Sequence, residues 1–133
     1  MELLTHALRQ RLLANGASPG DHVPLVKLFN PLGAATWLIT ELDVDGDTLF
    51  GLADLGFGCP ELGSVSLAEL VAVRLPLGLG IERDLYFTAR HPLSVFAHAA
   101  RAQGHITEHP DHLAHAAAAL ARAPAAGRSR SPP

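Results

Sequence analysis

Four aspartates in the stretch "ELDVDGDTLFGLADL", residues 41–55, are spaced as calcium ligands could be. A helix-loop-helix calcium loop supplies oxygen ligands at positions 1, 3 and 5, glycine at position 6 and a bidentate acid at position 12. Counted from Asp43, aspartates fall at all four acidic positions, but Thr48 stands where the glycine belongs. Both flanks alternate as strands do, and Asp45-Gly46 is a hairpin signal. We therefore predict a hairpin turn.

A second stretch, "HITEH" at residues 105–109, matches the H-x-x-E-H pattern of inverted zinc peptidases. That chemistry needs both histidines on one face of a rigid helix, a third ligand and a supporting shell. Here Gly104 precedes the motif, Pro110 follows it, and the surroundings are rich in alanine. We predict no catalytic zinc, and at most adventitious metal binding by a histidine set: His105, His109 and His112.

Other signatures of chemistry are missing from the sequence. There is no phosphate-binding glycine loop, no nucleophile elbow and no glycine fingerprint for a dinucleotide. Cys59 is the single cysteine, so no intramolecular disulfide forms, and no neighbouring base activates the thiol. No cofactor is expected.

Charge is unevenly distributed along the chain. The formal net charge is −3, but residues 28–73 contain no Lys or Arg. The acidic side chains of that stretch are Glu41, Asp43, Asp45, Asp47, Asp54, Glu61 and Glu69. Such a region is either a solvated acidic face or a surface for a basic partner or a cation. Nucleic-acid binding is not favoured, because the basic residues Arg122, Arg128 and Arg130 would bind weakly and with strong salt dependence.

Periodicity, caps and breakers indicate the elements that must position these residues. Helices are predicted at 5–14, 66–74 and 92–103, and strands at 22–29, 35–42, 48–55, 61–65 and 81–87. Short links force antiparallel neighbours. The fold class is α+β: a small curved antiparallel sheet of four to five strands with helices packed mainly on one face.

The domain prediction is one α+β domain over residues 1–103, followed by an Ala/His-rich, weakly helical to disordered tail over 104–133. The first ten residues do not resemble a signal peptide, and no apolar run reaches the length of a membrane span. We expect a cytoplasmic protein without a membrane partner.

Four residues inside the predicted strands have open interpretations. Trp37 is either a core residue or, if exposed, an interaction anchor. Arg83 and Asp84 are neighbours on a strand, so at most one of them faces the core. A charged side chain there needs a polar partner, for example an oppositely charged group with which it forms a structural ion pair. Gly51 predicts a bulge or a close backbone approach.

From residue 26 to residue 87 the order of features resembles the bacterial family catalogued as domain of unknown function 2958. The most specific pieces are "FGLADLG", "ELGSVSLAEL" and "IERDL", and the N-terminal "LLTHALRQRL" extends the likeness to roughly the first 90 residues. Members are often encoded on plasmids, phages and other mobile elements. The resemblance implies a fold and a genomic setting, but it brings no activity.

Two hypotheses for function follow. The first is a non-enzymatic accessory module that binds a protein through the acidic hairpin side. A narrower version of this hypothesis is an anti-defence protein. The binding residues of the module would be Trp37, Glu41, Asp43, Asp45, Asp47, Glu61, Arg83 and Asp84. The alternative is a small enzyme with acid–base chemistry at Glu41, Glu61, Arg83 and Asp84. The identity of the partner is open, and an open sheet edge also permits a homodimer.

Overall fold

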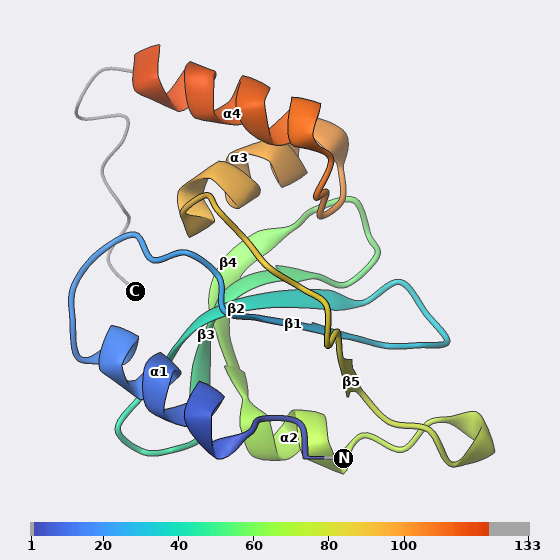
Figure 1. The fold of residues 1–133 in the computed structure, drawn as a ribbon. Coiled ribbons are helices and arrows are strands. Elements are labelled where there is room, and N and C mark those ends of the chain that lie inside the picture. Colours follow the sequence, from blue (N-terminus) through green and yellow to red (C-terminus); the bar gives the residue numbers. More distant parts are fainter. Residues whose placement is uncertain (1, 123–133) are drawn as a thin grey trace.

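The computed structural model describes residues 2–122, and Figure 1 shows a central sheet flanked by helices. The helices are α1 (His6–Gly16), α2 (Leu67–Ala72), α3 (Leu93–Gln103) and α4 (Pro110–Arg122), with a 3-10 turn η1 (Pro76–Gly78). The strands are β1 (Val26–Phe29), β2 (Thr36–Leu42), β3 (Thr48–Asp54), β4 (Glu61–Ser66) and β5 (Glu82–Arg83).

The strands form one antiparallel sheet in the order β4-β3-β2-β1-β5. β1 to β4 are a meander in which each strand pairs with the next, as short connections require. β5 returns to the far edge and pairs with β1. The predicted α+β class with an antiparallel sheet is confirmed, and the sheet has five strands.

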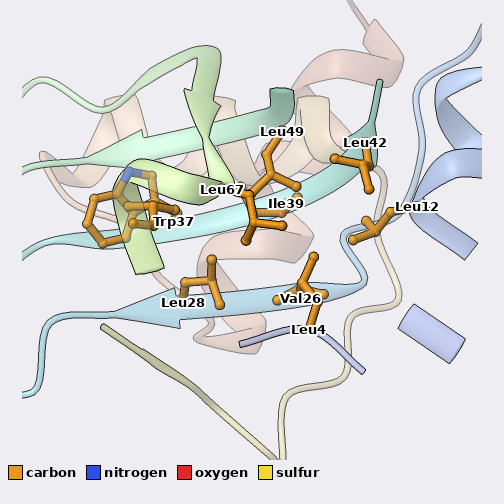
Figure 2. Packing of buried hydrophobic residues seen from close by; sticks show 10 residues of the cluster. Leu4, Leu12, Val26, Leu28, Trp37, Ile39, Leu42, Leu49 and Leu67 are labelled. Atoms are coloured by element: carbon orange, nitrogen blue, oxygen red, sulfur yellow. The ribbon is translucent and has the colours of Figure 1, made fainter. Parts of the chain in front are cut away.

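One face of the sheet is covered by α1 and α2. Alternate positions of β1 and β2, among them Val26, Trp37 and Ile39, contact leucines from both helices in one buried cluster. Figure 2 shows these side chains converging on the same side of the strands. Trp37 is 8% exposed, so its interpretation as a core residue is confirmed.

The opposite face is covered by α3 and α4, which lie above the sheet in Figure 1. Leu38 and Leu52, which alternate with residues of the first face, pack there against Phe96 and Leu113. The helices thus divide between both faces, whereas we expected them mainly on one. The central strands explain the difference, because β2 buries residues of both faces.

A bulge in β2 fixes where α1 docks. Ile39 pairs with Gly51 and Glu41 pairs with Phe50, the residue before Gly51, so Thr40 is the extra residue. The carbonyl of Thr40 accepts a 2.9 Å hydrogen bond from Asn15 Nδ2 at the end of α1. A Cβ on Gly51 would lie 1.9 Å from the carbonyl oxygen of Leu38. The predicted bulge or close approach at Gly51 is confirmed, since both occur there.

Two strands are shorter than predicted by several residues, and β2 and β3 are each shorter by one. The 22–29 strand begins at Val26, beyond Pro24, which has no N–H to donate. The 81–87 strand is reduced to Glu82–Arg83 because Asp84 turns the chain: its Oδ1 accepts from Tyr86 N at 2.9 Å, and its carbonyl accepts from Phe87 N.

Residues beyond 103 pack against the domain. Leu113 and Ala116 of α4 are buried, and Ile106 N donates to the buried Asp54 carboxylate at 3.0 Å. This packing is more extensive than a weakly helical tail implies, while the division at 103/104 itself stays a prediction. The predicted disordered end, 124–133, lies outside the described residues. Among residues 2–122, no helix combines the length and the apolar character needed to cross a membrane.

Candidate functional site

The β2–β3 turn is a hairpin loop, as predicted. Asp43 N donates to Thr48 O at 2.8 Å and Gly46 N donates to Asp43 O at 3.0 Å, so four residues close the loop. Gly46 has a φ of 72°, a left-handed conformation that glycine adopts without strain. The Asp45-Gly46 pair therefore makes the turn, inside a longer loop than the two-residue one that its sequence favours.

Asp45 holds this loop together. Its Oδ1 accepts from the backbone N–H groups of Asp47 and Thr48 at 2.8 Å each, and its Oδ2 accepts from Thr48 Oγ1 at 2.6 Å. The pKa of Asp45 is lowered from its ordinary 3.8, first by the Thr48 hydroxyl and then by the two backbone donors. This carboxylate stabilises the turn.

Asp47 connects the loop to α2. Its Oδ1 accepts from Ala68 N and its Oδ2 accepts from Ser66 Oγ, both at 2.8 Å. Ser66 Oγ in turn accepts from Glu69 N at 3.2 Å, as a helix cap does. Asp47 and Ser66 together satisfy the first N–H groups of α2, so Asp47 also acts within the fold.

Of the acidic hairpin residues, Asp43 is exposed and Glu41 is half-buried on β2. Within residues 2–122, no group of three or more His, Cys, Asp or Glu side chains is arranged to hold a metal ion. Asp43 and Asp45 are therefore the hairpin carboxylates that are exposed to a partner, and Asp45 keeps its charge while it holds the turn.

The residues of the enzyme hypothesis are not brought together. Glu61 pairs with Ala53, Ala53 with Trp37, Trp37 with Leu28, and Leu28 with Arg83. Four steps between neighbouring strands separate Glu61 from Arg83 by about 19 Å along the sheet. The two side chains lie on opposite edge strands, so they cannot act on one small substrate.

Arg83 and Asp84 each bind a separate part of the chain. Arg83 Nη1 donates to the carbonyls of Leu3 at 2.7 Å and Glu2 at 3.2 Å, which fixes the segment before α1. Asp84 lies 3.8 Å from Lys27 Nζ, which also contacts Glu108 at 2.6 Å. The expected structural ion pair forms at Asp84, whereas Arg83 binds backbone carbonyls.

The histidine segment is held by local contacts. His112 Nδ1 lies 2.8 Å from the buried Thr107 Oγ1, and His109 Nδ1 accepts from Asp111 N at 3.1 Å. His105 Nδ1 is 2.9 Å from the carbonyl of Ile106. The rings of His109 and His112 are 4.9 Å apart. Residues 105–109 precede α4, so the motif does not lie on a helix.

A shallow hollow of about 190 Å³ lies beside Trp37, over β2, β3 and β4. Gly51 and Gly63 pair directly across β3 and β4, which leaves two adjacent positions without side chains. Trp37, Val65 and Glu61 line the hollow around them. Two of the predicted binding residues, Trp37 and Glu61, line this hollow together.

The hollow opens at β4, the edge strand on that side of the sheet. Gly63 and Ser64 are exposed, and a Cβ on Gly63 would meet nothing within 4 Å. We did not predict these two residues as part of a site. The sequence "ELGSVS" contains no Lys or Pro, the residues that often protect an edge strand. This pattern could have indicated an unprotected edge, but that β4 lies at the edge of the sheet follows from the whole fold.

A larger hollow of about 520 Å³ lies between the segment before α1, α2 and the start of β5. Its volume is in the range of small-molecule sites. Aliphatic side chains line it together with the polar groups of Glu2, His6 and Arg9, and the charges of Glu2 and Arg9 have opposite signs. None of the predicted site residues lines it.

Comparison with known proteins gives one family. The family model described as "Protein of unknown function (DUF2958)" matches residues 3–107 of this chain, which include the whole sheet, α1, α2 and α3. No curated protein and no solved structure gives a significant match.

Proposed function

Because this chain belongs to the DUF2958 family, for which no function is known, we propose from its geometry that it is a non-enzymatic protein-binding module. One observation carries the proposal. Every charged side chain from residue 28 to residue 73 is acidic, and this stretch forms β2, β3, β4 and α2. Its formal charge is −7, against −3 for the whole chain.

Exposed carboxylates continue this acidic character beyond the hairpin. Asp43 lies at the loop, Glu61 at the start of β4 and Glu69 on α2, and all three are exposed. Like-charged groups at the surface of a small protein steer an oppositely charged partner and disfavour wrong ones. The partner we propose is therefore a protein with a basic surface. A narrower version of this proposal is an anti-defence protein, whose acidic side occupies the basic, DNA-binding surface of its partner.

The enzyme hypothesis is less well supported. It requires Glu61 and Arg83 in one pocket, and their positions on opposite edge strands separate them. Acid–base catalysis needs both groups within hydrogen-bonding reach of one substrate.

The test is a capture experiment from host lysate with matched charge variants of the full chain. Glu61→Gln/Glu69→Gln removes two exposed carboxylates from the acidic side. Glu2→Gln/Asp111→Asn removes two exposed carboxylates elsewhere and is the control. We expect a partner that the wild type and the control retain and the first variant loses. Equal capture by all three proteins would contradict the proposal.

A further inference from the structure

We propose that β4 is the edge to which the partner adds a strand: an extended segment that carries Lys or Arg and inserts one apolar side chain into the hollow beside Trp37. This inference rests on the proposed function and specifies how the binding occurs. Three independent features of the described residues support it: the backbone of β4, the shape of the sheet beside it and the charge around it.

The backbone of β4 is available for pairing. Among residues 2–122, β4 pairs with β3 and with no other strand. Its ladder with β3 runs from Glu61 to Ser66 without a register shift, so the strand is regular over six residues. Proteins usually protect such edges with Lys, Pro, bulges or very short strands. β5, at the other edge, has two residues and ends in a turn, whereas the six residues of β4 include no Lys, Pro or bulge and carry one charged side chain, Glu61, at the start of the strand.

The hollow provides a pocket of the right size for one side chain. Its volume of about 190 Å³ is below the range of about 300–1,000 Å³ typical of small-molecule sites. It lies next to the edge because Gly63 of β4 and Gly51 of β3 are cross-strand partners. In strand addition, main-chain hydrogen bonds supply affinity and pockets for alternate side chains supply specificity.

The charge around the edge selects a basic segment over a second copy of this chain. Glu61 begins β4, and Glu69 lies on the helix that follows it. Pairing two β4 edges would bring two regions of formal charge −7 together, which is unfavourable. Lysines or arginines flanking an added strand would face these carboxylates.

The experiment is a titration of the full chain with a synthetic ten-residue peptide of alternating Lys and Val, followed by Trp37 fluorescence. Trp37 is the single tryptophan and lines the hollow, so it reports occupancy directly. We expect saturable binding by the wild type. Gly63→Leu fills the hollow where a Cβ meets nothing, and we expect it to weaken binding about tenfold. Ala102→Leu, which adds the same side chain at an exposed position on α3, is the control.

A second peptide, N-methylated at alternate amides, keeps the charge but cannot complete the main-chain pairing. Losing these hydrogen bonds should weaken binding about tenfold or more. Equal binding of both peptides, or no binding of either, overturns strand addition. So does a dimer in sedimentation that Gly63→Leu dissociates, because a second copy would then occupy the edge.

The charge variants distinguish this inference from the proposed function. If Glu61→Gln/Glu69→Gln weakens both peptides equally and N-methylation has no effect, the acidic surface binds but no strand is added. If N-methylation and Gly63→Leu abolish binding while the charge variant has no effect, the strand is added and the electrostatic basis of the proposed function is wrong.

Discussion

Gly51 and Gly63 are cross-strand partners, but replacing them by alanine should have opposite effects on stability. Gly51→Ala should destabilise the fold, whereas Gly63→Ala should stabilise it. At Gly51 the new Cβ would lie 1.9 Å from the carbonyl oxygen of Leu38 and 2.9 Å from Ile39 Cα. These are backbone atoms of the central strand, so they cannot rotate away as a side chain could. At Gly63 the new Cβ would meet nothing within 4 Å.

The magnitudes follow from these contacts. Overpacking a well-packed site costs about 1–3 kcal/mol, and we expect the upper end at Gly51 because the backbone of β2 must shift. Alanine in place of glycine within a strand gains about 0.5–1 kcal/mol, which is the expected result at Gly63. The two variants should therefore differ by about 3–4 kcal/mol in free energy of unfolding, although both make the same chemical change.

The assay is urea unfolding followed by far-ultraviolet circular dichroism, which reports on the backbone of the whole chain. An unchanged slope with a shifted midpoint would assign the effect to stability. Two outcomes would refute the reasoning: Gly51→Ala with wild-type stability, or an equal loss in both variants.

Three further predictions concern the polar contacts of the fold. Asn15→Ala should cost about 1–2 kcal/mol, since the carbonyl of the buried Thr40 loses its donor; chemical denaturation measures this. Asp47→Ala should lower the free energy of unfolding by about 1–2 kcal/mol, because the cap of α2 is lost. Asp43→Ala, at an exposed position, should change it by no more than about 0.5 kcal/mol. Equal effects of the two variants would contradict the assigned roles. The pKa of Asp45 in the folded state lies below its ordinary 3.8. The stability that this carboxylate contributes is therefore present above pH 3.8 and is lost as the pH falls through the lowered pKa. Asp45→Asn should flatten the decline in melting temperature below about pH 4, which thermal melts across this pH range measure.

Local patterns in the sequence were sufficient for most of the elements. The hairpin at Asp45-Gly46, the cap at Ser66 and the alternation through Trp37 each depend on neighbours within a few residues. Such short-range chemistry is readable from one sequence, and it indicated an antiparallel α+β fold.

The errors came from contacts between distant segments. Asp47 looked like part of a free acidic tip, but it caps a helix that begins 20 residues later. The alanine-rich residues after 103 were predicted to be a weakly helical tail, yet Leu113 and Ala116 of α4 are buried against the small residues of α3. The separation of Glu61 from Arg83 depends on strand order, which no local pattern specifies.

The arrangement of helices on the two faces has a consequence for synthesis of the chain. The buried residues of the cluster on the first face are complete once α2 has been made, at residue 72. The Leu38 and Leu52 face is covered by residues from 87 onward. At ribosomal rates of about 5–20 residues per second, synthesis from residue 73 to residue 122 takes roughly 3–10 s. During that interval the nascent sheet presents an uncovered leucine surface, which is the form of this protein that a ribosome-associated chaperone would meet.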